Sequence, residues 1–448
     1  MIHEAPATMA KSRGKRLSSQ SAPRTKRRLV MLALISGAVA INYLDRAIIG
    51  VATPGIRGEF HLDPVMMGWI FSAFSWSYFL AQIPGGVLLD RFGSRIVYLA
   101  AIAGWSAATL LHGLARGFAS LTGARLLLGL FEAPCFPANS NIVAAWFPRQ
   151  ERGMAIGVYT AAEYIPLAFL SPVLFWITAS YGWRALFVLS GGLGLIFTLA
   201  WAFGYRDPKD DPKVNEAELA YIREGGGRVA GEARPFSWRL LGQLISNRQI
   251  LALCLGQFAV YSTFVFFLTW FPTYLAEARH MAWIKVGFFA SLPYLAGFFG
   301  ILFASSLSDF LLRRGASLEI ARKLPVIIGL LGATTIVLAN YVESNALVIA
   351  ILSVAFFAQA MGSSGWAVLS EIAPKGALGL VGGLFSAAAN LAGIVIPLVV
   401  GAIYKQTGSF VWALAFIAGV AAVGAFAWIF LIGTLRPIEL EAEEGPAR

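Results

Sequence analysis

The sequence predicts an all-α membrane protein that crosses the bilayer twelve times. Hydrophobic residues make up 58% of its 448 residues and charged residues 13%. The mean hydropathy of +0.69 is too high for a soluble domain of this size. Nearly every apolar segment exceeds the roughly 20 residues that a helix needs to cross a ~30 Å hydrocarbon layer. The sequence lacks the short alternating segments of a membrane β-barrel, so the spans are expected to be helical.

Polar segments divide the expected spans into two sets of six. The spans are 29–50, 66–89, 95–115, 119–143, 153–179, 184–204, 249–276, 284–307, 322–341, 346–370, 377–403 and 410–435. We therefore expect a basic cytoplasmic tail at 1–28, an N-terminal six-helix bundle at 29–204, a cytoplasmic linker at 205–248, a C-terminal six-helix bundle at 249–435 and a cytoplasmic tail at 436–448. Within the linker, Asn215 with Glu218 at the third following position predicts a short capped helix.

The distribution of basic residues predicts the orientation of the chain. The formal charge is +11, and eight Lys and Arg residues fall in the first tail and eight in the linker. By the positive-inside rule, both termini and the linker lie in the cytoplasm. This placement explains the charge better than nucleic-acid binding does. The tail has no small-residue cleavage site, so we expect a solvated tail rather than a secretory signal.

One short motif occurs at the same place in both halves. Between spans 2 and 3 the chain reads GVLLDRFGSR, and between spans 8 and 9 it reads SSLSDFLLRRG. In each, an aspartate stands four residues after a small residue and arginines follow. We expect an ion-pair latch on the cytoplasmic face, formed by Asp90, Arg91, Arg95, Asp309 and Arg313. A single copy would fit a solvated turn, but two matching copies favour a transporter built from two repeats.

Five ionisable residues lie inside the spans, all of them in the first half: Asp45, Arg46, Arg125, Glu132 and Glu163. Charge inside a bilayer is costly, so such groups pair with each other or face a cavity, and they mark a functional path by default. Arginine stays protonated and presents a planar fork that fits a carboxylate, which makes Arg46 or Arg125 the expected anion receptor. A carboxylate beside an arginine can gain and lose a proton as its partner moves.

The segment RLLLGLFEAPCFP places Arg125, Gly129 and Glu132 at i, i+4 and i+7, on one face of a helix. Gly129 lets a neighbouring helix or a ligand approach between the two charges. Pro134 and Pro137 follow, and a proline in a spanning helix frees carbonyl groups and bends the axis.

Neutral polar residues form further stripes, for which helix packing is the alternative to a role in binding. They are Asn42 and Tyr43 in span 1; Ser75, Tyr78 and Gln82 in span 2; and Gln257, Tyr261, Gln359, Ser363, Trp366, Ser370, Ser386 and Asn390 in the second half. These stripes can line one shared cavity.

Several of these segments are similar to a known family. They are INYLDRA, PGGVLLDRFGSR, RLLLGLFEAPCFPANS, WFPRQERGMAIG, FFLTWFPTYL, and SEIAPKGALGLVGG with ANLAGI. Together they resemble the anion:cation symporter family of the major facilitator superfamily, and within it bacterial permeases for sugar acids such as D-galactonate, glucarate and hexuronates. The resemblance runs from about Asn42 to Tyr404.

This resemblance implies the major facilitator fold and proton-coupled import of an organic anion by alternating access. The protein would be a monomer in the cell inner (plasma) membrane, driven by the proton gradient and without a cofactor, a metal site, catalytic residues or a nucleic-acid partner. Asp45 and Glu132 match the proton carriers and Arg125 their coupling partner. The expected substrate-binding residues are Arg46, Tyr43, Tyr78 and Asn390, which match positions that contact the sugar acid, together with Gln82, Glu163, Trp366 and Ser370.

Glu163 departs from the galactonate branch of this family, which usually carries glutamine there. Two arginines balance Asp45 and Glu132, but Glu163 adds an unbalanced negative charge that opposes an anion. Glu163 is protonated at working pH, pairs elsewhere, or serves a different ligand. Our hypothesis is that it is mostly protonated and hydrogen-bonds a hydroxyl group of the ligand.

Other functions fit the sequence less well. The substrate can be another carboxylate, such as a hexuronate, glucarate or a small dicarboxylate. An organophosphate exchanger usually has a basic residue in each half, whereas spans 7 to 12 contain no embedded Lys or Arg. A drug exporter would not need paired arginines. An enzyme would need a nucleophile or metal set, but the four histidines are scattered, and His112 is expected at the membrane interface. A transporter-like sensor would need an output domain.

Overall fold

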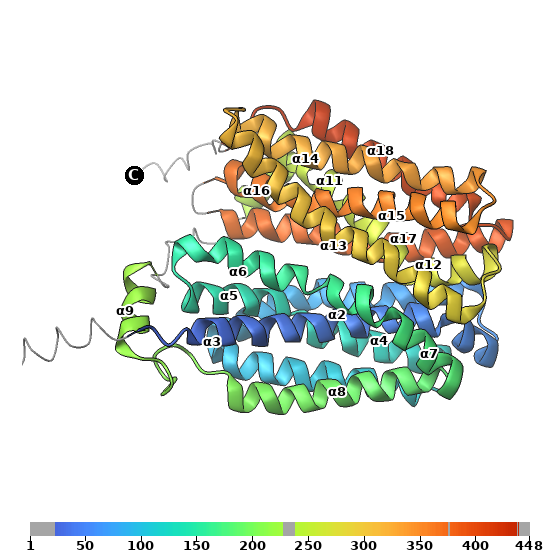
Figure 1. The fold of residues 1–448 in the computed structure, drawn as a ribbon, viewed down its shortest axis with the longest axis horizontal. Coiled ribbons are helices and arrows are strands. Elements are labelled where there is room, and N and C mark those ends of the chain that lie inside the picture. The colour runs from blue at the N-terminus through green and yellow to red at the C-terminus, as the bar shows by residue number, and fades with distance from the viewer. Residues whose placement is uncertain (1–22, 227–237, 375–376, 437, 439–448) are drawn as a thin grey trace, which may run out of the picture.

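The computed structural model describes residues 23–226, 238–374, 377–436 and 438, so most of both predicted tails lies outside the described residues. Every regular element in the described part of the chain is a helix, and the helices form two bundles that lie side by side (Figure 1). Helix α9 lies at the left of this view, beside the first residues of α2. We call this the terminal end of the molecule and the opposite end the distal end.

The N-terminal bundle consists of α2 (Arg27–Phe60), α3 (Pro64–Gly113), α4 (Phe118–Glu132), α5 (Cys135–Trp146), α6 (Arg149–Ala161), the π-helical turn η1 (Pro166–Leu170), α7 (Ser171–Tyr181) and α8 (Trp183–Gly204). The linker contains α9 (Glu216–Glu224) and α10 (Trp238–Ser246). The C-terminal bundle consists of α11 (Arg248–Thr269), α12 (Phe271–Thr273), the π-helical turn η2 (Tyr274–Ala278), α13 (Trp283–Arg313), α14 (Leu318–Ala333), the 3-10 helix η3 (Thr334–Tyr341), α15 (Asn345–Met361), the 3-10 turn η4 (Gly362–Ser364), α16 (Gly365–Ile372), α17 (Leu378–Thr407), α18 (Val411–Phe426) and the π-helical turn η5 (Ala427–Leu431).

The helical membrane architecture predicted from the sequence is confirmed. Among the described residues, ten helices are long and apolar enough to cross a membrane. One of them, α3, contains two predicted spans, because the backbone turns at Gly93, whose φ is +76°. The predicted span 119–143 is divided between α4 and α5, each of which is too short by itself. The predicted ranges are therefore helical over most of their length, while the number of crossings stays a prediction.

Several spans are interrupted partway along their length. The break between α4 and α5 comes at Ala133 and Pro134, close to where the prolines predicted a bend. The span made of α6 and α7 is broken at Ala162 and Glu163, where η1 follows, and the span made of α15 and α16 is broken by η4. Such π-helical and 3-10 turns expose backbone groups and are frequent at functional positions.

Ion pairs join the two bundles at the distal end. The Arg57 guanidinium of α2 donates to both carboxylate oxygens of Glu277 in η2, at 2.7 and 2.9 Å, and Glu277 also accepts a hydrogen bond of 2.5 Å from the Tyr404 hydroxyl. Lys405 of α17 pairs with Asp63 at 2.9 Å, just before α3. This end of the molecule is therefore closed.

Glycines bring the two backbones together at the same end. A Cβ atom on Gly50 would lie 2.5 Å from the Leu268 carbonyl oxygen, and one on Gly68 would lie 2.6 Å from that of Pro397. On the other bundle, a Cβ atom on Gly401 would lie 2.6 Å from a backbone oxygen of α3. Side-chain carbons are essentially never found closer than 3.0 Å to such atoms, so only glycine fits at these positions.

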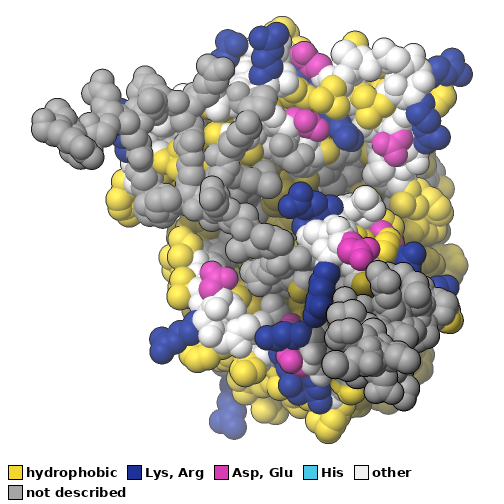
Figure 2. Space-filling model, turned by 90° about the vertical axis from the view of Figure 1, so that its left-hand side faces the viewer, with side chains coloured by type: hydrophobic (Ala, Val, Ile, Leu, Met, Phe, Trp, Pro, Cys, Tyr) yellow, Lys and Arg dark blue, Asp and Glu magenta, His cyan; other side chains and the backbone are white. Residues whose placement is uncertain are grey.

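No ion pair joins the bundles at the terminal end within the described residues. Asp90 and Asp309 are exposed there, and neither forms an ion pair with another described residue. The cytoplasmic latch thus stays a prediction. Figure 2 looks onto this end and shows Lys and Arg side chains among Asp and Glu side chains.

Glu218 of α9 ties the beginning of the chain to the N-terminal bundle. Its carboxylate accepts hydrogen bonds from Thr25 and from the backbone N–H groups of Arg27 and Arg28, and it pairs with the Arg28 guanidinium at 3.1 Å. Burial alone would raise the pKa of Glu218, but these hydrogen bonds outweigh burial and lower the pKa below its usual value. The predicted cap is confirmed, since the Asn215 side chain accepts from the Glu218 N–H at 3.0 Å.

Candidate functional site

Four of the five charged residues predicted inside the spans are buried in the N-terminal bundle. Asp45 is 1% exposed, Arg46 4%, Arg125 2% and Glu132 0%, while Glu163 is half-buried. They come from α2, from α4 and from the break that follows α6.

Arg46 and Glu132 form the central ion pair of this site. The Arg46 Nε donates to Glu132 Oε2 at 2.7 Å. The guanidinium also lies over the rings of Phe74, Tyr43 and Tyr78, at 4.6, 4.8 and 5.0 Å from their centroids. Arg46 Nη2 and Glu132 Oε1 are buried without a hydrogen-bond partner among the described residues. Each partner therefore retains hydrogen-bonding capacity for a further group.

Asp45 points away from this pair. Its Oδ1 accepts a hydrogen bond of 2.5 Å from the Ser190 hydroxyl of α8, and Thr109 of α3 and Arg125 of α4 also lie nearby. Adjacent helix residues diverge by about 100°, which sends Asp45 toward α8 and Arg46 toward α4. The two neighbours thus have separate partners, as their spacing predicts.

Arg125 lies close to Arg46, because both guanidinium groups lie over the Phe74 ring, that of Arg125 at 5.2 Å. Its Nε and Nη1 are buried and have no partner among the described residues. Gly129 permits the approach of α3, since a Cβ atom there would meet the Phe74 carbonyl oxygen at 2.2 Å. The prediction for Gly129 is therefore confirmed for a neighbouring helix.

His112 lies in the last turn of α3 and is fully buried against protein, so its depth in the membrane stays a prediction. Its Nδ1 lies 2.8 Å from the Ala108 carbonyl oxygen, and its ring stacks on Phe187. The apolar neighbours of α8 explain the burial, since α3 packs closely along that helix.

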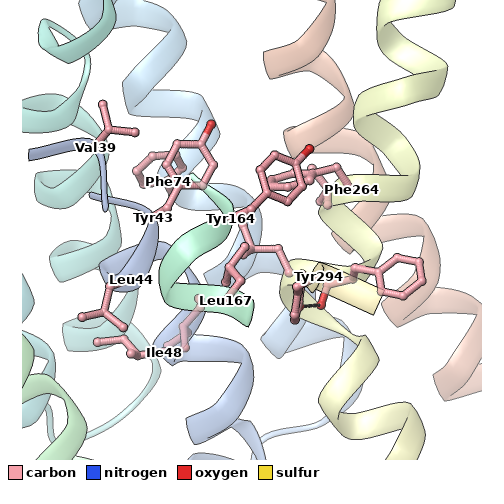
Figure 3. Packing of buried hydrophobic residues seen from close by; sticks show 14 of the residues in the cluster. Val39, Tyr43, Leu44, Ile48, Phe74, Tyr164, Leu167, Phe264 and Tyr294 are labelled. Carbon is pink, nitrogen blue, oxygen red and sulfur yellow. Dashed lines mark hydrogen bonds between the residues drawn. The ribbon is translucent and has the colours of Figure 1, made fainter. Parts of the chain in front are cut away.

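An aromatic cluster connects this site to the C-terminal bundle (Figure 3). Phe264 of α11 makes ring contacts with Tyr43, Tyr164 and Tyr261 at centroid distances of 5.4 to 6.1 Å. The half-buried Glu163 precedes Tyr164 and lies beside Tyr43, within electrostatic reach of Arg46. The Glu163 carboxylate, at the break after α6, thus lies at the boundary between the bundles.

The remaining predicted binding residues are more scattered. Tyr78 is buried against Arg46, and Gln82 is half-buried one turn further along α3. Asn390 of α17 is buried and donates to the Ser386 carbonyl oxygen of its own helix at 2.9 Å. Trp366 is 49% exposed and packs edge-on against Phe385. The Ser370 side chain lies outside the described residues. These roles stay predictions.

Tyr164 and Ser190 were missing from the predicted site, and Tyr261 was predicted only as part of a polar stripe that can line the cavity. The spacing of Tyr261 in its polar stripe was a usable signal, whereas Ser190 looks like a packing residue in an apolar span. Tyr164 follows Glu163, and only the helix break turns both toward the α11 aromatic rings.

Buried polar atoms without partners are concentrated in this part of the chain. Within the described residues they include both amide atoms of Asn42, Asp45 Oδ2, Glu132 Oε1 and two nitrogens of Arg125. Buried polar groups normally find a partner, so such a concentration indicates a place where a ligand or proton binds. No group of three or more metal-ligating side chains occurs in the described part of the chain.

The two bundles and their buried arginine–carboxylate site define a membrane transporter. The sequence pattern of the Major Facilitator Superfamily matches residues 35–339, and the chain belongs to this family. Its curated relatives are transporters rather than enzymes.

A D-galactonate transporter of Escherichia coli O6:H1 is 43% identical over 423 residues, covering 92% of this chain and 97% of the relative. A probable galactarate/D-glucarate transporter of Bacillus subtilis is 41% identical, covering 92% of this chain and 93% of the relative. A probable sulfoacetate transporter of Cupriavidus necator is 33% identical, covering 95% of this chain and 98% of the relative.

The fold is also similar to solved structures. A bacterial homologue of the human lysosomal transporter Spinster, in an inward-facing and unoccupied conformation, matches with a TM-score of 0.66 at 19% identity, over 91% of this chain and 95% of that one. Its inward-facing and occupied form matches with a TM-score of 0.64. At this identity the likeness concerns the fold alone.

Proposed function

We propose that the protein is a proton-coupled symporter that imports an organic anion, in the first place a sugar acid such as D-galactonate, by alternating access. The names of the E. coli and B. subtilis relatives support a sugar acid as the substrate. The observation that carries the coupling is the buried ion pair of Arg46 with Glu132, at 2.7 Å. In this proposal the substrate carboxylate competes with Glu132 for the Arg46 guanidinium.

Competition for Arg46 links the anion to the proton. A substrate carboxylate that binds the Arg46 fork bidentately displaces Glu132, and a buried carboxylate without its partner takes up a proton. Conversely, protonation of Glu132 frees Arg46 for the substrate. Each binding event therefore favours the other, which is the requirement for symport. Asp45, buried beside Ser190, is the second proton carrier in this proposal, and Arg125 couples the two carboxylates.

The hydroxyl groups of a sugar acid need neutral polar partners around the carboxylate. Tyr43 and Tyr78 border Arg46 directly, and Asn390 and Gln82 supply amide groups from the two bundles. Glu163 is the third carboxyl group beside two arginines, so we assign it a protonated form that donates to a substrate hydroxyl. Trp366 and Ser370 complete the proposed binding set from the C-terminal bundle.

We further propose that the protein is a monomer in the inner (plasma) membrane, with both termini in the cytoplasm and no cofactor other than the proton gradient. The basic residues near the terminal end support this orientation. The closed distal end then faces outward, and its ion pairs must separate to admit the anion. The predicted latch of Asp90 and Asp309 would form at that moment.

An aldarate such as glucarate is the second candidate substrate. Its two carboxylates would require two receptors, and Arg46 and Arg125 lie over the same Phe74 ring with unpartnered nitrogens on both. The sulfoacetate relative likewise supports a small substrate with two anionic groups.

Uptake by purified protein in proteoliposomes tests the function. We expect labelled D-galactonate to accumulate only under an inward proton gradient, and an uncoupler to abolish accumulation. Aldonates, aldarates, hexuronates and small dicarboxylates serve as competitors that rank the substrates. Failure to accumulate any sugar acid would refute the proposal, and gradient-independent exchange of phosphate esters would favour the exchanger. Arg46→Lys keeps the charge but loses the fork, so uptake should fall at least tenfold.

A further inference from the structure

Ser190 donates the side-chain hydrogen bond that holds Asp45 in the described part of the chain, and Thr109 of α3 also approaches the Asp45 carboxylate. The Ser190 hydroxyl lies 2.5 Å from Asp45 Oδ1, and Oδ2 has no partner among the described residues. Both side chains are buried. Asp45 thus differs from Glu132, which has a guanidinium as its partner.

The packing of α8 against α3 holds Ser190 in place. Gly191 and Gly194 follow it on α8, and a Cβ atom on Gly194 would lie 2.2 Å from the Ser106 hydroxyl oxygen of α3. A Cβ atom on Gly191 would lie 2.8 Å from the Ser106 carbonyl oxygen. These two glycines let α8 approach, and the hydroxyl next to them reaches Asp45 on α2.

We propose that Ser190 is a positioning residue that sets the proton affinity of Asp45 and thereby the pH range of transport. This inference rests on the proposed proton-coupled function. A hydroxyl that donates to a carboxylate stabilises the ionised form, because the bond to a charged acceptor is stronger than that to a neutral acid. Removing the donor therefore makes Asp45 hold its proton to higher pH.

The charged groups around Asp45 come from α2 and α4 rather than from α8, which carries Ser190. They are Arg125 and Glu132 of α4, while Arg46, its neighbour on α2, is turned toward Glu132. From α3, Thr109 faces Asp45, and His112 lies one turn further on, near Arg125. The sole ionisable residue of α8 is Arg184, at its distal end. The effect of Ser190 can therefore be measured against a constant electrostatic background.

In this proposal, Glu132 and Asp45 change their protonation in response to different events. Glu132 responds to the arrival of the substrate carboxylate at Arg46, whereas Asp45 responds to the distance between α2 and α8. A relative movement of these helices would break the hydroxyl contact and favour protonation, without any change at the anion receptor. Ser190 makes this second step dependent on helix packing.

Ser190→Ala tests the proposal through the pH profile of gradient-driven uptake in proteoliposomes. We expect the half-maximal point of the limb that reports Asp45 to move upward by about one pH unit, equivalent to roughly tenfold tighter proton binding. Ser106→Ala is the matched control, because it removes a buried hydroxyl at the same helix contact that donates only to Ile102 of its own helix. The control profile should coincide with that of the parent protein. A coincident Ser190→Ala profile, or an equal shift in both variants, would overturn the proposal.

A measurement without transport separates this inference from the proposed function. Asp45→Asn removes the titration of Asp45 from the pH dependence of the melting temperature of the purified protein. Ser190→Ala should move that titration upward, and it should have no further effect in the Asp45→Asn background. An unmoved titration refutes the role of Ser190 even if no substrate is transported. A moved titration in a protein that accumulates no sugar acid would uphold the contact and reject the symport function.

Discussion

Replacing Glu277 by glutamine should open the distal end of the molecule. The change removes the charge that accepts two hydrogen bonds from Arg57, at 2.7 and 2.9 Å, and one from Tyr404, at 2.5 Å. The Arg57 and Glu277 side chains are 20% and 31% exposed, so solvent weakens the pair. A partly buried pair of this kind, whose carboxylate also accepts a hydrogen bond from a hydroxyl group, contributes about 1.5 kcal/mol.

A loss of about 1.5 kcal/mol corresponds to roughly a tenfold change in the equilibrium between closed and open distal ends. If the open state represents about 1% of molecules, it rises to about 10%. The buried Thr273 of α12, a helix that packs against α2, offers a position from which to measure this change. We would introduce Thr273→Cys after replacing Cys135 and Cys254, and follow its alkylation in purified protein.

We expect alkylation of this cysteine to be about ten times faster with Glu277→Gln. Glu59→Gln provides the matched control, because Glu59 pairs with Arg184 and accepts from Trp183 at the same end but within one bundle. This control should leave the rate unchanged. Equal rates in both variants would show that the ion pair between the bundles does not hold the distal end closed.

Three further predictions concern single carboxylates. Asp45→Asn should abolish gradient-driven accumulation while substrate counterflow persists, and full accumulation would refute its role as a proton carrier. Glu163→Gln should retain uptake and shift its pH profile, because the variant loses a titratable group but keeps a donor; an unchanged profile would remove the hypothesis. Because the pKa of Glu218 is lowered in the folded protein by its hydrogen bonds, its ionised form stabilises the fold above the unfolded value of about 4.3. Glu218→Gln should thus melt lower than the parent protein at pH 7, and the gap should close as the pH falls below 4; a constant gap would contradict this.

Local sequence patterns predicted the helices and the buried charges well. The spans follow from length and hydropathy, which need no tertiary information. The shared face of Arg125, Gly129 and Glu132 follows from helical periodicity, and the close approach at Gly129 is confirmed. The predicted cap at Asn215 is confirmed for the same reason, since all its parts lie within four residues.

Partners that come from different helices could not be predicted. Periodicity places Arg125 and Glu132 on one face, but Glu132 pairs with Arg46, because the crossing of α2 and α4 decides which guanidinium reaches it. The break beside Tyr164 has a local signal, because Pro166 begins η1, but the contact of Tyr164 with Phe264 of α11 depends on how the two bundles pack. The partners of Arg57 and Lys405 could not be predicted either, since each residue pairs with a carboxylate of the other bundle.

Because of the backbone contacts at Gly50, Gly68 and Gly401, the presence or absence of a Cβ atom there affects the balance between the closed and open conformations. An added methyl group is excluded while the distal end is closed, and we expect it to fit once the two bundles separate there. Alanine is also the better helix former, so the exchange would leave the helices themselves intact. A structural study of the opposite state could use the same exchange to obtain a uniform population.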